Sequence, residues 1–423
     1  MKNNIKKKLE LIAPAGNLEK MKTAFAFGAD AVYLGIPDFS LRVRINDFDI
    51  VGISEATKYA HKIGKKVYVT ANIFAHNKHL KKLPAHIKEL ERIGVDGIFV
   101  SDPAIFEEVK KIWPKAKIIL STQANCTNWQ AAKFWLKLGA KRIILGRELS
   151  LAEVREIKKK NPKLELECFV HGALCMAYSG RCFLSKYFND RNANLGDCSQ
   201  PCRWNYKISA DNHETMELVE EEHGSYILNS KDLCLIKRMP ELIEAGVSAF
   251  KIEGRAKSVY YLANIIGAYR KAIDAISENV EQKKLKKELN FLYKELEEKM
   301  FHRGYTEGFM FEEGKTAQNL DNSHNLPEWE FCGQVIKNKN LKIKNKKYDS
   351  VVIVKAHNTI KVGDEIEIVR PSYDIIKMKI KKMINAKNGE EIQEAHGGGS
   401  GDTVILEVKQ EVPEYSVVRR RIT

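Results

Sequence analysis

Leu18-Glu-Lys-Met-Lys-Thr-Ala-Phe-Ala-Phe-Gly-Ala-Asp-Ala-Val-Tyr-Leu-Gly-Ile36 is the stretch that decides the fold. Its apolar residues recur at helical spacing up to Phe25. Gly28 follows, and glycine suits this position because the residue after a helix often takes the left-handed conformation. Residues 31–36 are then a short apolar run of the kind that forms a buried strand. The stretch therefore predicts a helix, a glycine joint and a strand.

This unit recurs through the first 255 residues. Glycine or proline joints precede most of the predicted strands, which are Leu9–Pro14, Ala31–Ile36, Lys66–Asn72, Gly97–Asp102, Lys117–Ala124, Arg142–Glu148, Leu164–His171 and Ala249–Arg255. Eight strands that alternate with helices predict an α/β protein with a TIM-like (β/α)8 barrel. A doubly wound sheet is the structural alternative.

An insert from Gly172 to Gly246 delays the eighth unit. In a barrel of this kind the loops after the strands form the catalytic face, so an insert after the seventh strand is expected over the barrel mouth. Polar residues at the other strand ends should converge there, namely Arg42, Arg44, Asn72, His76, Gln123, Asn125, Arg147, Glu148, Glu253 and Arg255. Each of these residues alone is typical of structural hydrogen bonding. Their shared position is what indicates a site.

Four cysteines lie in the insert with the spacing C-x6-C and then C-x3-C: Cys175, Cys182, Cys198 and Cys202. Disulfides rarely persist in a reducing compartment, so four nearby thiols in a chain without export signals indicate metal ligands. Four thiolates suit structural zinc or an iron–sulfur cluster, and the loose spacing favours the cluster. Four ordinary buried thiols are the alternative. Cys234, in the same insert, is the best substitute ligand.

The composition is that of a globular protein, with 44% hydrophobic and 30% charged residues among 423. The start is basic, but Glu10 and Pro14 interrupt the apolar segment that a signal peptide needs. No run approaches a membrane span, so we expect a cytoplasmic protein. The net charge of +15 is compatible with a polyanionic partner such as RNA, or with solvated lysine-rich helix faces such as residues 283–299.

The pattern changes near Trp329 to short alternating or β-branched runs. The predicted strands are Phe331–Lys337, Ser350–Lys355, Glu365–Val369, Ile376–Ile384 and Thr403–Val408. They predict a small antiparallel β-barrel. The expected domains are thus a barrel over 1–310 with its insert at 172–246, a linker over 311–329 and a β-barrel domain over 330–423. The arginine-rich tail at 417–422 is expected to be a polyanion contact or a solvated edge.

Motifs of hydrolases are missing from the sequence. It contains no G-x-S-x-G and no H-E-x-x-H, and the nearest match, His213-Glu-Thr-Met-Glu, lacks the second histidine. Because catalytic triads need not be local in sequence, this absence only weakens a peptidase interpretation.

The string Glu167-Cys-Phe-Val-His-Gly-Ala-Leu-Cys-Met-Ala-Tyr-Ser-Gly-Arg-Cys-Phe-Leu-Ser185 resembles the signature of the collagenase-like peptidase family, in its branch of unassigned peptidases. Supporting strings are Leu11–Gly16, Gly28–Tyr33, Ser40–Arg44, Asn229–Leu233, Lys251–Ser258 and His302–Gly308. The resemblance covers residues 9–310, and the end from residue 330 is similar to the small barrel of many members.

Within this family the chain is most similar to the bacterial proteins that hydroxylate tRNA. The resemblance implies 5-hydroxylation of the wobble uridine of tRNA, with prephenate as co-substrate and a 4Fe-4S cluster on Cys175, Cys182, Cys198 and Cys202. It also implies dependence on the iron–sulfur assembly machinery. A collagenase-like peptidase activity is the alternative.

These expectations assign roles at the barrel mouth. An RNA base must be extruded before an enzyme can act on its ring, and arginines can hold a dicarboxylate such as prephenate by bidentate contacts. We expect catalytic roles for Arg147, Glu253, Arg255 and His171. We expect substrate binding by Arg42, Arg44, Asn72, His76, Gln123 and Lys251. The small basic β domain is expected to hold the tRNA backbone.

Overall fold

The computed structural model describes residues 9–36, 38–41, 47–206, 228–311, 318–339, 350–398 and 401–422. The chain forms two compact units. The first comprises Met1–Met21, Ala29–Ala256 and Phe301–Asn325. The second comprises Lys22–Gly28, Lys257–Met300 and Leu326–Thr423. Residues 257–300 therefore group with the C-terminal strands, whereas the sequence placed them with the barrel.

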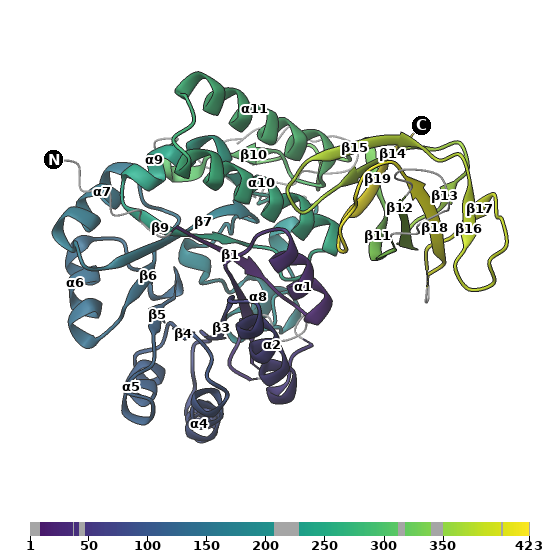
Figure 1. Ribbon diagram of the computed structural model, residues 1–423. Coiled ribbons are helices and arrows are strands. Elements are labelled where there is room, and N and C mark those ends of the chain that lie inside the picture. Colours follow the sequence, from purple (N-terminus) through teal and green to yellow (C-terminus); the bar gives the residue numbers. More distant parts are fainter. Residues whose placement is uncertain are drawn as a thin grey trace. The chain divides into compact units, whose positions relative to one another are not determined.

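A closed ring of eight parallel strands forms the centre of the first unit (Figure 1). Its strands are β1 (Glu10–Pro14), β2 (Ala31–Gly35), β3 (Lys66–Ala71), β4 (Gly97–Val100), β5 (Ile118–Leu120), β6 (Arg142–Ile144), β7 (Glu165–Gly172) and β9 (Val247–Ile252). The strands pair in sequence order, and β9 closes the ring because it pairs in parallel with both β7 and β1. The predicted TIM-like barrel is confirmed, and the doubly wound sheet is excluded.

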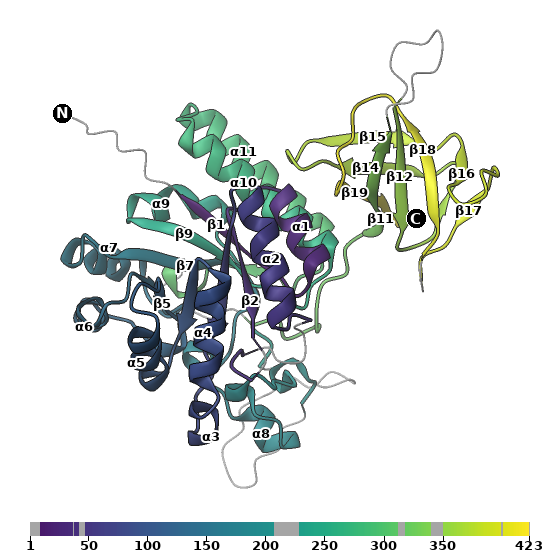
Figure 2. The same ribbon diagram turned by 60° about the horizontal axis from the view of Figure 1, so that its bottom comes forward.

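Helices surround this ring in Figures 1 and 2. Those of the first unit are α2 (Ile50–Lys62), α3 (Asn77–Leu80), α4 (Leu83–Ile93), α5 (Pro103–Ile112), α6 (Trp129–Leu138), α7 (Leu151–Lys160) and α9 (Met239–Glu244), and α1 (Leu18–Ala26) spans the boundary between the units. The glycine joints act as predicted: Gly94 and Gly139 end α4 and α6 in the left-handed conformation.

Several strands end earlier than predicted, and β5 shows a physical reason. We expected a strand to Ala124, but β5 ends at Leu120, and Thr122–Ala124 forms the 3-10 turn η2. The Ser121 hydroxyl accepts a hydrogen bond from the backbone of Thr122, which favours this turn over a continued strand. The turn matters for the site because it carries Gln123.

Two strands that the sequence did not predict join this sheet, one within the insert and one after residue 300. β8 (Asp232–Cys234) pairs antiparallel to β7, and β10 (Tyr305–Thr306) pairs with β8. The insert also contains α8 (Leu184–Asn189) and the short turns η3 (Tyr178–Gly180), η4 (Ala193–Leu195) and η5 (Pro201–Arg203). Further turns are η6 (Ile236–Arg238) and η7 (Gly308–Met310).

Part of the predicted linker at 311–329 packs against the first unit. The Asn229 side-chain amide donates to the carbonyl oxygens of Asn322 (3.0 Å) and Ser323 (3.2 Å). The first unit accordingly extends to Asn325.

The second unit combines two long helices with antiparallel strands. The helices are α10 (Val259–Ser277) and α11 (Gln282–Lys299). The main sheet has the order β15-β14-β19-β11-β12-β18-β16, and β13 pairs separately with β17. The strands are β11 (Trp329–Lys339), β12 (Ser350–Ala356), β13 (Ile360–Lys361), β14 (Glu365–Val369), β15 (Ile375–Lys379), β16 (Met383–Asn385), β17 (Glu394–Ala395), β18 (Thr403–Val408) and β19 (Val417–Arg421). The predicted antiparallel β fold is confirmed, although the single strand predicted over 376–384 is two strands.

The arginine-rich tail is not an edge of the sheet, although Arg421 near its end is exposed. The tail forms β19, which lies between β14 and β11 in the sheet. Arg419 is 0% exposed and donates to Glu367 (2.9 Å), Glu295 (2.5 Å) and Asn264 (3.1 Å). A buried, paired arginine cannot meet RNA phosphates. The same contacts explain why α10 and α11 group with the C-terminal strands.

Among the described residues, no helix is both long enough and apolar enough to cross a lipid bilayer.

Candidate active site at the barrel mouth

The ends of β2 and β9 bring a tyrosine, a carboxylate and a guanidinium together at the barrel mouth, which is the end where the strands finish. The Tyr33 hydroxyl lies 3.0 Å from the Ile252 carbonyl oxygen and 3.4 Å from Glu253 Oε2. The Arg255 guanidinium lies over the Tyr33 ring, 5.7 Å from its centre, and donates to Ser40 Oγ at 2.8 Å. Glu253 and Arg255 are thus close together, as predicted. We call Tyr33, Glu253 and Arg255 the mouth triad.

A glycine on β2 makes room for the mouth triad. A Cβ atom at Gly35 would lie 2.6 Å from Ser40 Oγ and 2.9 Å from an Arg255 nitrogen. These separations are shorter than van der Waals contact, so a larger residue would displace the Arg255 guanidinium. Because Gly35 has no side chain, it leaves the space that the Arg255 guanidinium occupies.

Lys251 lies inside the barrel on β9, two residues before Glu253 of the mouth triad. Its ammonium is 3.5 Å from the centre of the Phe99 ring and 4.1 Å from that of Tyr33. Its carboxylate partner is Glu167, at 3.3 Å. Burial lowers the pKa of Lys251 to about 8, although Glu167 opposes this shift. A lysine with this pKa can exchange a proton near neutral pH.

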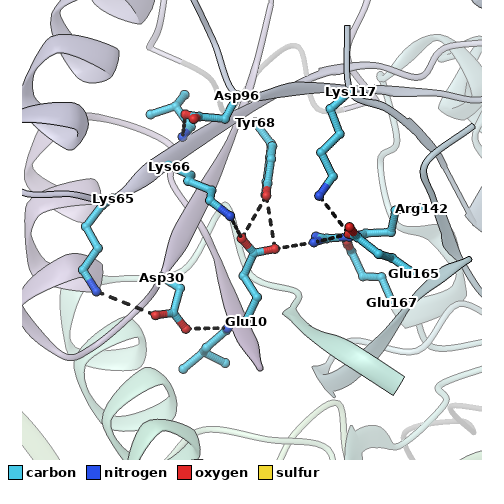
Figure 3. Close-up of polar contacts among 12 residues, drawn as sticks. Glu10, Asp30, Lys65, Lys66, Tyr68, Asp96, Lys117, Arg142, Glu165 and Glu167 are labelled. Atoms are coloured by element: carbon cyan, nitrogen blue, oxygen red, sulfur yellow. Dashed lines mark hydrogen bonds and ion pairs between the residues drawn. The ribbon is translucent and has the colours of Figure 1, made fainter. Parts of the chain in front are cut away.

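An ion network begins at the opposite end of the barrel, where β1, β3, β6 and β7 start (Figure 3). Arg142 Nη2 lies 2.6 Å from Glu10 and 2.8 Å from Glu165, and Arg142 Nη1 lies 3.1 Å from Glu167. Glu10 also accepts from Lys66 (2.8 Å) and from the Tyr68 hydroxyl (2.9 Å). Burial alone would raise the pKa of Glu10, but Arg142 and Lys66 outweigh it and hold the pKa at about 2.

Sequence reasoning missed this network, together with Tyr33. A signal was present, since Glu10, Arg142, Glu165 and Glu167 are charged residues inside strands that are otherwise apolar. Because Glu167 binds both Arg142 and Lys251, the network continues from the start of the strands toward the barrel mouth.

A second polar group follows β3 and β5. Asn72 Nδ2 lies 3.4 Å from Gln123 Oε1 and 3.4 Å from Ser121 Oγ, and Ser121 Oγ donates to Gln123 Oε1 at 2.9 Å. The predicted substrate-binding residues Asn72 and Gln123 are therefore neighbours.

The cysteine-bearing insert docks on the loops after β5 and β6. Arg181 donates from Nε (3.0 Å) and Nη2 (2.6 Å) to the Gln123 carbonyl oxygen. The Ser179 backbone N–H donates to the Glu148 carboxylate, and Ser179 Oγ bonds Asn125 Oδ1 at 2.9 Å. The insert thus lies over the barrel mouth, where the position after strand seven predicted it.

The remaining predicted residues are placed as follows. Arg147 donates to the Ala173 carbonyl oxygen at 2.8 Å, and its guanidinium lies 5.2 Å from the Phe169 ring centre. The buried His171 ring packs edge-on against Tyr305 of β10, with ring centres 5.4 Å apart. His76 is exposed at the start of α3. Arg42 and Arg44 lie outside the described residues.

The four insert cysteines are close enough to interact electrostatically. Burial raises the pKa of the Cys202 thiol, and the neighbouring Cys175, Cys198 and Cys182 add to this rise, whereas Arg203 opposes it. Backbone N–H groups donate to two of the sulfurs, from Leu184 to Cys182 (3.4 Å) and from Gln200 to Cys198 (3.4 Å).

These features fit the donor set of an iron–sulfur cluster. All eight cysteines are free thiols, and N–H to sulfur hydrogen bonds are typical around protein-bound clusters. In the described part of the chain, no group of three or more His, Cys, Asp or Glu side chains is placed to hold a metal ion. A 4Fe-4S cluster takes one cysteine on each iron. The cluster stays a prediction, as does the substitute ligand Cys234, which is buried on β8.

The fold and the site define a (β/α)8-barrel protein with a thiol-rich insert over its mouth and a C-terminal β domain. Family comparison agrees: residues 16–320 match peptidase family U32, and residues 327–419 match the C-terminal domain of the same family. The chain belongs to peptidase family U32.

Three relatives are similar over most of their length. The tRNA hydroxylation protein P of Escherichia coli is 37% identical, over 98% of this chain and 97% of its own. The tRNA hydroxylation protein P1 of Bacillus subtilis is 39% identical, over 88% of this chain and 86% of its own. A collagenase of Porphyromonas gingivalis is 29% identical, over 95% of each chain.

Proposed function

We propose that this protein is an RNA-modifying hydroxylase that adds a hydroxyl group to C5 of the wobble uridine of tRNA. We further propose that it uses prephenate as co-substrate and a 4Fe-4S cluster. The observation that carries the proposal is the similarity to the tRNA hydroxylation protein of E. coli, 37% over nearly the whole of both chains. The barrel mouth, covered by a thiol-rich insert, supplies a place for the chemistry.

The mouth triad is where we place the reacting base. A uridine must leave its stacked position to reach a barrel mouth. Tyr33 and Glu253 would then present a hydroxyl and a carboxylate to its polar edge. The Tyr33–Glu253 contact of 3.4 Å would be exchanged for contacts with the base.

Two guanidinium groups are suited to bind a dicarboxylate such as prephenate. Arg255 is held by Ser40, and Arg147 is held by the Ala173 carbonyl oxygen. Each guanidinium has five N–H donors in a planar fork, which matches a carboxylate in a bidentate contact. The existing hydrogen bonds orient the groups and so reduce the entropy lost on binding.

Lys251 is suited to move a proton at its Nζ atom. Its pKa of about 8 places both protonation states within reach of neutral pH. The contacts with Glu167 and with the Tyr33 ring connect this ammonium to the ion network on one side and to the mouth triad on the other.

Cys175, Cys182, Cys198 and Cys202 would hold the cluster, loaded by the iron–sulfur assembly machinery. When bound, the cluster supplies one-electron chemistry. The N–H donors of Leu184 and Gln200 would stabilise its thiolate ligands, and Arg181 fixes the loop between Cys175 and Cys182 to the mouth.

The proposal is tested in a deletion strain. Nucleoside mass spectrometry of its tRNA should show loss of 5-hydroxyuridine derivatives, and the wild-type gene should restore them. Arg255→Lys should fail to restore them, because lysine cannot make the bidentate contact. Arg155→Lys, an exposed position on α7, is the matched control and should restore them fully. Unchanged tRNA in the deletion strain would refute the proposal.

Peptidase activity is the second candidate, favoured by the similarity to the P. gingivalis collagenase. Purified protein should then cleave denatured collagen, and Cys175→Ala should not abolish cleavage, because a peptidase does not need the cluster. Robust cleavage together with normal tRNA in the deletion strain would favour the peptidase.

A further inference from the structure

A group of aromatic side chains is exposed on the insert beside the four cysteines. Phe183 and Tyr187 are 76% and 82% exposed, and Phe188 and Trp204 are also exposed. Tyr206 is half-buried. We call these five residues the aromatic surface. Exposing so much ring area to water is unfavourable, so a surface of this kind indicates a binding site.

The rings form a connected surface. Phe188 lies at its centre, with ring centres 5.1 Å from Tyr187, 5.8 Å from Trp204 and 5.7 Å from Tyr206. Phe183 precedes Tyr187 by one turn of α8, since the Tyr187 N–H donates to the Phe183 carbonyl oxygen at 2.9 Å. Residues four apart lie on the same helix face.

The aromatic surface borders the thiols and the barrel mouth. The Tyr206 hydroxyl donates to the carbonyl oxygen of Pro201 at 2.8 Å, directly before Cys202. Ser185, on the same helix as Tyr187, lies with its hydroxyl 3.7 Å from Cys198 Sγ. On the other side of the insert, the Phe74 N–H bonds the Asn194 carbonyl oxygen at 3.1 Å, next to the end of β3.

The insert also carries cationic side chains. Residues 173–206 contain four of them, Arg181, Lys186, Arg191 and Arg203, of which Lys186 and Arg191 pair with Asp190 and Asp197. Arg181 and Arg203 bond carbonyl and amide oxygens, which orient their guanidinium groups without cancelling the charge.

We propose that the aromatic surface binds single-stranded RNA by stacking the nucleotides that flank the uridine extruded into the barrel mouth. The inference rests on the proposed function. Aromatic side chains beside cations are what single-stranded RNA requires, because every base has a π face and every nucleotide a phosphate. A protein partner is expected to use aliphatic contacts as well, and the exposed apolar side chains at 173–206 are aromatic apart from Met176.

The test uses full-length protein and a fluorescent anticodon-arm RNA with uridine at the wobble position. Tyr187→Ala should weaken binding by roughly 5- to 150-fold, since stacking one base contributes about 1–3 kcal/mol. Tyr187→Phe should bind like wild type because it keeps the ring, whereas Tyr187→Leu should bind like Tyr187→Ala. Phe134→Ala, at a 57% exposed position on α6, is the matched control and should not change the affinity.

A second measurement separates stacking from charge. The dependence of log Kd on log salt should have the same slope in wild type and Tyr187→Ala, because the substitution removes no phosphate contact. Circular dichroism should show the same thermal unfolding for both proteins.

The outcomes are distinguishable. If wild-type protein does not bind the RNA, the proposed function fails. If wild type binds, and Tyr187→Ala and Phe183→Ala bind equally well, only the aromatic surface is overturned. It is also overturned if these variants change the sedimentation of the protein from dimer to monomer at unchanged RNA affinity, because the surface is then an interface between two copies.

Discussion

Replacing Arg142 by methionine should destabilise the barrel strongly. Methionine fills a similar apolar volume but removes the charge that Glu10, Glu165 and Glu167 share (Figure 3). Glu10 and Glu167 are buried, so water cannot replace the lost partner. In the variant, Lys66 would still pair with Glu10, and Lys251 would still pair with Glu167.

The free energy of unfolding should fall by about 3–5 kcal/mol, which is the usual cost of leaving one partner of a buried ion pair uncompensated. The pKa of Glu10 gives a second estimate. A fall from 4.5 to about 2 corresponds to roughly 3 kcal/mol of stabilisation of the charged form. Because the folded-state pKa is the lower one, this stability is present above pH 4.5 and is lost as the pH falls toward 2.

Urea unfolding followed by tryptophan fluorescence is a suitable assay. Four of the five tryptophans, Trp113, Trp129, Trp135 and Trp204, lie in the first unit. Glu10→Gln should lower the free energy of unfolding by less than Arg142→Met does, since Arg142 would still pair with Glu165 and Glu167. The double variant should cost less than the sum of the two single variants, because the glutamine that replaces Glu10 is neutral and needs no cation. A loss below about 1 kcal/mol for Arg142→Met, or strict additivity, would refute the reasoning.

Three further predictions concern the cluster, the mouth and the second unit. Anaerobically purified protein should be brown, with about four irons per chain by iron assay. The Cys182→Ala variant should lose this iron, and the control variant Cys126→Ala should keep it. Stoichiometric zinc in the wild-type protein would contradict the cluster. Arg255→Lys should reduce tRNA hydroxylation at least about tenfold at unchanged thermal stability, because a bidentate site does not tolerate lysine. Arg419→Met should destabilise the second unit by up to about 3–5 kcal/mol, because it removes one of the two cations that Glu295 and Glu367 share, the other being Lys299, and hydrogen exchange in α11 should show it.

The sequence predicted the barrel well because its signals are local. Apolar strand runs and glycine joints such as Gly94 and Gly139 depend on a few neighbouring residues. β8 and β10 were missed because strands of three and two residues exist only through their pairing with β7 and with each other. β19 was missed because its three successive arginines interrupt the apolar run by which a buried strand is recognised. Arg419 becomes compatible with burial only through Glu295 and Glu367, which are distant in sequence.

The position of the candidate site was also suggested by the sequence, since barrel chemistry occurs where the strands end. The residues that form this candidate site were harder to predict. Tyr33 has the sequence context of a core aromatic, and only its hydrogen bond to Glu253 shows that it belongs to the mouth triad. Lys251 was predicted as a binding residue, but its low pKa follows from burial among Phe99 and Tyr33, which no local pattern reveals.

The ion network links the stability of the barrel to the chemistry at its mouth. Glu167 is shared, with one oxygen 3.1 Å from Arg142 and the other 3.3 Å from Lys251. Without Arg142, the whole charge of Glu167 would act on Lys251 and raise the pKa of the lysine, because a nearby anion favours the ammonium form. If Lys251 moves a proton during hydroxylation, Arg142→Met must therefore displace the pH profile of activity toward higher pH in protein that is still folded. An Arg142→Met enzyme with an unchanged pH profile would show that Lys251 binds substrate without taking part in proton transfer.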